Sequence, residues 1–255
     1  MQERWKFILK ELEDKGKIKV AEISREYGCS EVTIRNDIKK MDGEGLLMRT
    51  HGGAVRYQSK TEAPYPYVSE SLMRNMERKK QIAAKAYELI EERDTIIIDD
   101  ASTSFYLAEY IKEHPQKRLA VVTNSLLAGN ELAGVKHVEL YMVGGYVGGY
   151  IASTMGEEAV EHMKEFHVDK AFIGAHGINF KAGLTSIATP QMQMKQAILK
   201  ATEKVYVLAD SSKFSGGYLS VICPIDAVDQ IITDRELPLS TAELAKEYKV
   251  PLIVA

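Results

Sequence analysis

The chain has 255 residues, 45% of them hydrophobic and 27% charged, which is ordinary for a soluble protein with a sizeable core and excludes disorder throughout. One or two globular units fit this length, and two is the better expectation. The longest apolar runs are a few residues, far below the roughly 20 that span a bilayer. The charged start MQERWKFILK is unlike a secretory signal. We therefore expect a cytoplasmic protein that does not associate with membranes.

The net charge of −3 does not suggest binding to nucleic acid, but it hides an asymmetry along the chain. Residues 1–57 hold 12 Lys and Arg against 10 Asp and Glu, whereas the remaining residues are acidic overall. An excess of two positive charges is weak by itself, because solvated helix faces often carry as much. Whether this segment binds nucleic acid therefore depends on where its charges lie.

The first 41 residues have the spacing of three helices. Apolar residues three and four apart indicate a first helix that ends near Lys15, and KIKV then alternates like a very short strand. A second helix is predicted over Ala21–Tyr27, followed by Gly28, because a left-handed cap favours glycine. Ser30 can then cap a third helix, EVTIRNDIKKM, whose inward stripe is Ile34, Ile38 and Met41.

The outward face of this third helix is polar and basic. Two short helices joined by a tight glycine-containing turn, the second with such a face, are what a helix-turn-helix requires. Arginine can bond guanine bidentately, asparagine can bond adenine, threonine can touch the thymine methyl, and lysines suit phosphates. The pattern therefore predicts binding to double-stranded operator DNA through Ser30, Thr33, Arg35, Asn36, Lys39 and Lys40.

The next stretch, LMRTHGGAVRY, is typical of a β-hairpin, because HGG separates two short extended pieces. Such a hairpin would form a wing, from which Arg49, His51 and Arg56 would reach adjacent phosphates or the minor groove. The alternative is a three-helix packing module whose charges are only solvated, since short motifs also match by chance.

The run from Arg4 to Val55 resembles the winged helix-turn-helix of the DeoR family of bacterial transcription regulators, and the pieces SEVTIR and RTHGGA carry most of that resemblance. The family usually has two adjacent arginines on the reading helix, whereas here Arg35 is followed by Asn36. The resemblance therefore implies DNA binding but not an operator sequence.

Residues 57–69 hold two of the seven prolines and show no periodicity, which is typical of a linker. The expected division is a DNA-binding domain over 1–57, a linker over 58–74, and an α/β domain for effector binding and oligomerisation over 75–255. A helix from about Asn75 to Arg93 is followed by short apolar runs that alternate with helical segments. This alternation predicts a parallel sheet covered by helices, with right-handed crossovers.

Five of the predicted strands end in small or polar residues. These ends are Asp99–Thr103, Thr123–Ser125, Gly144–Gly145, Gly174–Gly177 and Asp210–Lys213. In open α/β sheets ligands bind outside the carboxyl ends of the strands, and hydroxyls with free N–H groups at a helix start favour an anion. We therefore expect a pocket for a phosphorylated small molecule. Taken singly, the serines could be helix caps, the glycine pairs could serve turns, and Lys213 could pair with Asp210.

The blocks DDASTS, VVTNS, AFIGAHGI, GLTS and LADSSKF also resemble, in this order, the sensor domain of the DeoR family, whose fold is similar to ribose-5-phosphate isomerase. The resemblance implies a sensor for phosphorylated sugars or related metabolites. It departs at Ser102 and Ser215, where the family usually has glycine, and at Gln191, where glutamate is typical. Together with Gly144 from the strand ends, the effector-site candidates that it implies are Asp100, Ser102, Thr103, Ser104, Thr123, Asn124, Gly174, Gly177, Asp210 and Lys213.

Two functions remain open at this point. An isomerase would need an acid or base beside the sugar, which Asp100, Asp210 or Lys213 could supply. The chain has no Gly-x-Ser-x-Gly elbow, and His162 and His167 lack metal-site spacing, so we expect no catalytic residue, metal or cofactor. We favour a transcription regulator, a repressor of sugar or carbon metabolism genes controlled by a phosphorylated sugar, that acts as a homo-oligomer, dimer or tetramer. The alternative is a sugar-phosphate isomerase-like enzyme with an accessory interaction domain.

Overall fold

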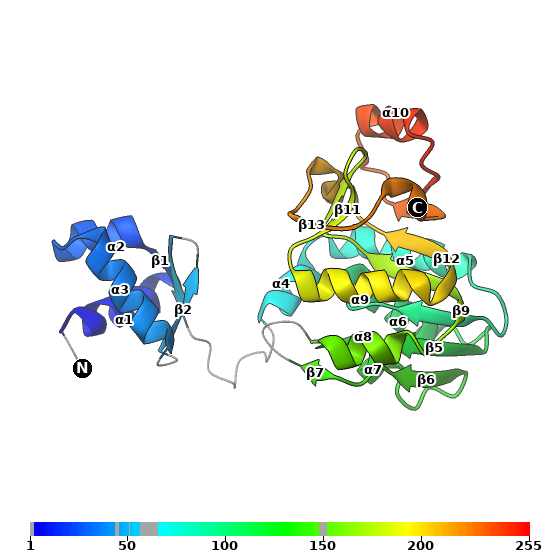
Figure 1. Cartoon of the computed structure of the whole chain (residues 1–255), viewed down its shortest axis with the longest axis horizontal. Helices are drawn as coiled ribbons and strands as arrows, with labels where there is room; N and C mark the ends of the chain where they lie inside the picture. The colour runs from blue at the N-terminus through cyan, green and yellow to red at the C-terminus, as the bar shows by residue number, and fades with distance from the viewer. Residues whose placement is uncertain (1–2, 44–45, 51, 57–65, 148–151) are drawn as a thin grey trace. The chain divides into compact units, whose positions relative to one another are not determined.

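The computed structural model describes residues 3–43, 46–50, 52–56, 66–147 and 152–255. The chain divides into two compact units, Met1–Pro64 and Tyr65–Ala255 (Figure 1). The smaller unit has one hydrophobic core and the larger unit has two. Within the described ranges, no helix is long and apolar enough to cross a bilayer.

The smaller unit contains three helices and an antiparallel sheet with the strand order β1–β3–β2. Its elements are α1 (Glu3–Lys15), β1 (Lys17–Lys19), α2 (Val20–Tyr27), α3 (Glu31–Gly43), β2 (Leu47–Thr50) and β3 (Gly53–Arg56). Ile8, Ile34 and Met41 are fully buried between the helices. The predicted helices, the short strand and the hairpin are thus confirmed.

Caps and a glycine define the turns of this unit. Gly28 ends α2 with φ 75°, in the left-handed region that favours glycine. The Ser30 hydroxyl accepts the Thr33 N–H at 3.2 Å and caps α3. A Cβ at Gly53 would meet the Ile18 carbonyl oxygen at 1.9 Å, so the close approach of β1 and β3 requires glycine there.

A buried carboxylate joins α3 to α1. Asp37 is 5% exposed and accepts hydrogen bonds from the Arg4 guanidinium at 3.1 Å and from the Trp5 indole N–H at 3.2 Å. Burial alone would raise the pKa of Asp37, but the hydrogen bonds from Arg4 and Trp5 hold that pKa below its ordinary value. The ionised carboxylate therefore fixes the orientation of α3 within the unit.

The larger unit is an α/β fold. Its helices are α4 (Pro66–Met73), α5 (Met76–Glu88), α6 (Ser102–Glu113), α7 (Leu126–Leu132), α8 (Glu157–Met163), α9 (Thr189–Lys200) and α10 (Leu239–Glu247), with short 3-10 helices η1 (Ser211–Ser215) and η2 (Ile225–Ala227). Its main strands are β4 (Thr95–Ile98), β5 (Leu119–Thr123), β6 (Val138–Met142), β9 (Val168–Gly174), β12 (Thr202–Leu208), β14 (Gln230–Thr233) and β15 (Leu252–Val254). Shorter strands are β7 (Tyr146–Val147), β8 (Thr154–Met155), β10 (Gly177–Asn179), β11 (Gly183–Ser186) and β13 (Ser220–Cys223).

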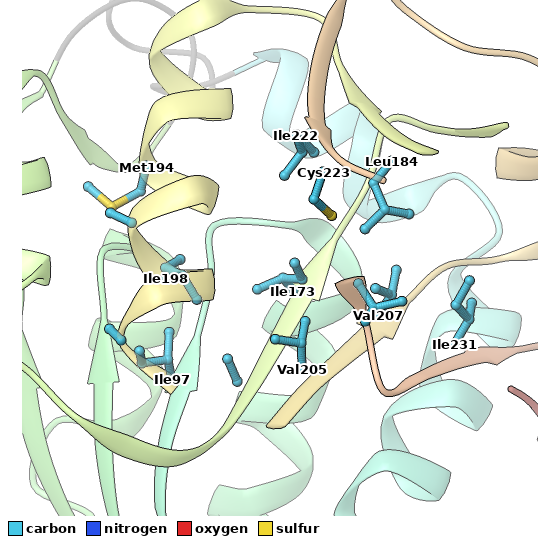
Figure 2. Packing of buried hydrophobic residues seen from close by; sticks show 14 of the residues in the cluster. Ile97, Ile173, Leu184, Met194, Ile198, Val205, Val207, Ile222, Cys223 and Ile231 are labelled. Carbon is cyan, nitrogen blue, oxygen red and sulfur yellow. The ribbon is translucent and has the colours of Figure 1, made fainter. Parts of the chain in front are cut away.

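The seven main strands form one parallel sheet in the order β15–β14–β12–β9–β4–β5–β6, as the alternating pattern predicted. Successive side chains of a strand point to opposite faces. Ile97 of β4 therefore joins the core under α8 and α9, whereas Ile96 and Ile98 join the core under α5, α6 and α7. Figure 2 shows part of the first core, with Ile198 of α9 to the left of Ile173 of β9.

Three features differ from the prediction. Residues 66–73, expected in the linker, form α4, and the Tyr106 hydroxyl of α6 donates to the Leu72 carbonyl at 3.0 Å. The helix expected to reach Arg93 ends at Glu88, because the chain then turns and Arg93 itself adopts φ 71°. The antiparallel sheet β10–β11–β13 was not predicted, since strands of three or four residues carry too little periodicity.

Candidate functional sites

The exposed face of α3 forms a polar and basic surface in the smaller unit. Arg35, Asn36, Lys39 and Lys40 are exposed, and Thr33 is half-buried beside the cap. The Arg35 guanidinium lies 2.7 Å from the Glu31 carboxylate, an exposed pair one helical turn apart. Such a pair contributes little to stability, so Arg35 can exchange it for another partner.

The wing places a second cation beside this surface. Arg35 of α3 and Arg49 of β2 line the same depression, together with Thr50 and Gly52 of the hairpin. The Asp42 carboxylate accepts the Arg49 N–H at 3.0 Å, which ties the start of the wing to the end of α3. His51 lies outside the described residues, as does the side chain of Arg56, so their predicted roles stay predictions.

One exposed residue of α3 was not predicted. Val32 is 64% exposed and lies one turn before Arg35 and Asn36 on the same face. An apolar side chain outside the buried stripe of Ile34 and Ile38 was the signal available in the sequence. Such a side chain can contact the methyl group of thymine.

In the larger unit, the order of the strands creates a crevice. The chain fills one half of the sheet through β4, β5 and β6, and the other half through β9, β12, β14 and β15. The neighbouring strands β4 and β9 therefore lead into connections that run in opposite directions, and ligands bind at such switch points. A pocket of about 780 Å³, its open mouth included, lies here, lined by residues at and just beyond the ends of both strands: Asp100, Ala101, Ser102, Thr103, Gly174, Ala175 and His176.

One part of the pocket can receive an anion. The first N–H groups of α6 have no carbonyl partners within the helix, no side chain caps them, and Ser102 and Thr103 line the pocket. Lys213 lines it as well, and among the described residues it forms no ion pair, so the predicted alternative pairing with Asp210 is absent. The Ser71 hydroxyl of α4 donates to the Ser102 hydroxyl at 3.1 Å.

A buried network of charges lies beneath the other part of the pocket. The carboxylate of Asp99 is 1% exposed and accepts hydrogen bonds from the N–H groups of Ala101 at 3.1 Å and Gly174 at 2.9 Å. It also accepts from the Ser104 hydroxyl and from the Lys195 ammonium group. Asp99 is therefore a structural centre that holds the two strand ends together, with no free acceptor left for a ligand.

Asp100 is the carboxylate that faces the pocket. Its Oδ1 lies 3.6 Å from the Lys195 ammonium, and its Oδ2 accepts from Ser153 at 2.9 Å and from the Gln191 amide at 3.4 Å. Gln191 also lines the pocket, so the residue that departs from the family pattern points into the site. Burial alone would lower the pKa of Lys195, but the carboxylates of Asp99 and Asp100 raise it above its ordinary value. The ammonium group is thus charged and compensated.

His176 contributes a neutral side chain to the same pocket. Burial, together with the positive charge of Lys195, lowers the pKa of His176 to about 4, although Asp100 acts in the opposite direction. At neutral pH the imidazole therefore adds hydrogen-bonding capacity without adding charge.

The structure brings five of the eleven predicted effector residues to the pocket, namely Asp100, Ser102, Thr103, Gly174 and Lys213. Gly174 has a steric reason to be glycine, because a Cβ there would lie 2.3 Å from the Ala101 Cβ. The role of these five residues in effector binding stays a prediction.

The other six residues do not line the pocket. Ser104 donates to Asp99, Thr123 donates to the Ile98 carbonyl at 2.6 Å, and Asp210 accepts from Asn75 at 3.0 Å. Asn124, Gly144 and Gly177 likewise lie elsewhere: Asn124 donates to the Thr154 carbonyl at 3.3 Å, the Gly144 N–H donates to the His162 ring at 3.2 Å, and Gly177 is buried in β10.

The pocket residues that were not predicted as site residues include Ser71, His176 and Lys195. Ser71 lies in the segment expected to be a linker, where no signal was available. Lys195 could have been found, because it stands one turn after Gln191 and beside the buried Met194, a position that an unpaired lysine would not occupy. His, Cys, Asp and Glu side chains of the described residues form no group of three that could hold a metal ion.

A winged helix-turn-helix joined to an α/β unit with a small-molecule pocket defines a ligand-controlled DNA-binding regulator. The chain belongs to the DeoR family: residues 4–60 match the DeoR-like helix-turn-helix domain, and residues 74–235 match the DeoR C terminal sensor domain. This is a family of transcriptional regulators and not of enzymes, so the isomerase alternative is not supported.

Relatives span nearly the whole chain. The uncharacterized HTH-type transcriptional regulator FruR of Bacillus subtilis (strain 168) is 32% identical over 92% of this chain and 91% of its own length. The L-fucose operon activator of Haemophilus influenzae is 28% identical over the full length of both chains. The glycerol-3-phosphate regulon repressor of Escherichia coli (strain K12) is 25% identical over 96% of this chain and 95% of its own length.

Similarity to solved structures is lower. Ribose 5-phosphate isomerase A from Methanocaldococcus jannaschii is 18% identical, with a TM-score of 0.40 over 55% of each chain. A similarity at this level supports no inference about function.

Proposed function

We propose that the chain represses genes of sugar or carbon metabolism, and that a phosphorylated sugar or related metabolite releases it from operator DNA. The observation that carries this proposal is the pocket at the switch point between β4 and β9, where the uncapped start of α6 meets Lys213. A helix N-terminus with an adjacent lysine suits a phosphate group. The polar residues Asp100, Gln191 and His176 suit the hydroxyl groups of a sugar.

The position of α4 supports control of DNA binding by the ligand. Ser71 and Leu72 of α4 line the pocket, and α4 directly follows residues 57–65, which connect the two units in the sequence. A ligand changes an equilibrium only if it binds the two states with different affinities. A phosphate that displaces the Ser71 hydroxyl from Ser102 would move the start of the sensor unit. The ligand would then bind the displaced and undisplaced states with different affinities.

The remaining parts of the proposal concern the DNA. The reading surface consists of Thr33, Arg35 and Asn36, with phosphate contacts from Lys39, Lys40 and the wing. One winged unit covers little DNA, so a homo-oligomer on a two-fold operator is part of the proposal, as is a cytoplasmic location. The name of the glycerol-3-phosphate regulon repressor supports repression, whereas that of the L-fucose operon activator shows that a relative can act in the opposite direction.

A two-stage experiment tests this function. A thermal-shift screen of sugar phosphates identifies a ligand, and a gel shift on the DNA upstream of the chain's own gene then measures operator affinity with and without it. We expect the ligand to raise the melting temperature and to weaken operator binding. A ligand that tightens operator binding contradicts the proposed direction of control, and turnover of the ligand without any DNA binding contradicts the function.

Arg35→Ala is expected to weaken binding to the preferred operator about tenfold to a hundredfold more than binding to random DNA. A bidentate contact to guanine contributes about 1–3 kcal/mol of discrimination, which the variant loses. Fluorescence anisotropy with both DNAs, at one salt concentration, measures the two losses.

Lys39→Ala is the matched control on the same helix face. Loss of a phosphate contact weakens binding to both DNAs alike and reduces the slope of log affinity against log salt by about one unit. Equal losses on both DNAs for Arg35→Ala as well would mean that Arg35 contacts only phosphate.

A further inference from the structure

The parallel sheet of the larger unit has one long unpaired edge. The strand β6 (Val138–Met142) stands at the end of the strand order, and among the described residues it pairs only with β5 (Figure 1). At the opposite edge, β15 has three residues and directly follows Pro251, so that edge is short and bounded by a proline. β6 has five residues, no lysine or proline and no register shift against β5, so it lacks the usual protections of an edge strand.

The backbone groups of β6 point alternately to β5 and to the free edge. The His137 carbonyl accepts from β5 and the Val143 N–H donates to β5, so the odd-numbered residues of this stretch face that strand. The N–H and carbonyl groups of Leu140 and Met142 therefore point away from β5, as does the Val138 carbonyl. In the described part of the chain no second strand pairs with these groups.

Apolar side chains accompany the outward backbone groups. Tyr141 is 42% exposed and Met142 is 37% exposed, and Leu140 is only half-buried against the core. Tyr146 and Val147 of β7, which follows closely in the chain, are exposed as well. An edge strand with unpaired backbone groups and exposed apolar side chains is a template for the addition of another strand.

We infer that β6 binds β6 of a second copy of the chain in antiparallel register, with Leu140 opposite Leu140, so that the two seven-stranded sheets become one. This inference rests on the proposed function, which includes a homo-oligomer, and it names the interface. The two Leu140 residues exchange N–H···O bonds, and each Met142 N–H donates to the Val138 carbonyl of the other copy. The contact is two-fold symmetric, because each copy contributes the same strand.

The sequence VELYM favours this register over its neighbours. A two-fold axis at Glu139 would place two carboxylates directly opposite each other, which is destabilising. An axis at Tyr141 would place Val138 and Glu139 opposite residues beyond the end of β6. With the axis at Leu140 the whole strand is paired, and each Glu139 carboxylate faces a phenol. The Tyr141 hydroxyl, which donates to Glu139 of its own chain, can then also donate to Glu139 of the other copy.

Cysteine cross-linking of the full chain tests the register. Opposite Cα atoms of a hydrogen-bonded antiparallel pair are about 5.5 Å apart, which suits a disulfide. Under mild oxidation we expect Leu140→Cys to give at least tenfold more covalent dimer than Tyr141→Cys, whose two copies would lie on a diagonal at about 7–8 Å. Mass spectrometry of peptides shows that the bond joins the two introduced cysteines and not the native Cys29 or Cys223.

A matched pair of charge variants tests the contact between Glu139 and Tyr141. Both Tyr141→Glu and Tyr141→Lys remove the same exposed ring, but only the first places a carboxylate opposite Glu139 of the other copy. Sedimentation equilibrium is expected to give a dissociation constant of the oligomer at least tenfold larger for Tyr141→Glu than for Tyr141→Lys. Far-UV circular dichroism with thermal melting shows that each variant is folded.

The outcomes separate this inference from the proposed function. An oligomer that is cross-linked through Tyr141→Cys but not through Leu140→Cys, or that dissociates equally in the two charge variants, overturns the inference and leaves the homo-oligomer standing. A chain that stays monomeric at every concentration and is never cross-linked overturns the inference together with the homo-oligomer. Release from operator DNA by a sugar phosphate is measured separately by gel shift and tests the rest of the proposed function.

Discussion

Replacing Lys195 by methionine is expected to destabilise the larger unit by about 3–5 kcal/mol, the usual cost of removing one partner from a buried ion pair. The ammonium group is 3% exposed and compensates Asp99 and Asp100, which are 1% and 7% exposed. Methionine has a similar length, so the loss comes from the two uncompensated carboxylates and not from an empty cavity. Urea denaturation of the full chain, followed by far-UV circular dichroism, measures the change.

The matched control is Lys200→Met, at the exposed end of the same helix, which should change the free energy of unfolding by less than about 0.5 kcal/mol. Trp5 is the single tryptophan and lies in α1, so its fluorescence follows the smaller unit separately. Adding Asp99→Asn to Lys195→Met should recover part of the lost stability. A loss below about 1 kcal/mol for Lys195→Met would show that the network is not what holds the strand ends together.

The expected loss of stability in Lys195→Met reflects the role of the buried network of Asp99, Asp100 and Lys195 beneath the pocket. Asp99 accepts from Ala101 after β4, from Gly174 at the end of β9, and from Lys195 on α9, so one carboxylate joins three segments that are distant in the sequence. Asp100 directly follows Asp99 in the chain, and its side chain lines the pocket. The two adjacent aspartates thus have separate roles, one structural and one directed toward a ligand.

Local signals were sufficient to predict the smaller unit. The apolar stripe of α3, the left-handed Gly28 and the Ser30 cap are determined by residues close in sequence, and all three appear in the structure as expected. The bond from Arg4 and Trp5 to Asp37 was not predicted, because it joins residues more than thirty positions apart. Periodicity carries no information about which polar side chains meet across a core.

The parallel sheet was also predictable from local signals, since each main strand is a short apolar run. The residues that line the pocket were predictable only in part. Strand ends indicated where ligand-facing residues would lie, yet Thr123 and Asp210 turn their side chains to backbone and to other polar groups. Which residue of a strand end faces the crevice depends on the local turn. Ser71 lay beyond prediction, because it reaches the pocket from a helix that precedes the sheet.

Thr103→Arg is expected to abolish the response to effector while operator binding stays within about twofold of wild type. Thr103 is 4% exposed, lies in the first turn of α6 and lines the pocket beside Ser102. An arginine there would occupy the space expected for the phosphate, so we expect effector affinity to fall at least a hundredfold. The residues that read DNA belong to the other compact unit and are unchanged.

The measurement is a gel shift across a series of effector concentrations, using the ligand found by thermal shift. Thr103→Ser keeps the hydroxyl and should respond almost as wild type does, which separates loss of space from loss of a hydrogen bond. Thr241→Arg places the same side chain on α10, away from the pocket, and should respond normally. If Thr103→Arg still releases the operator at wild-type effector concentrations, the effector binds elsewhere, and the pocket between β4 and β9 is not the sensor site.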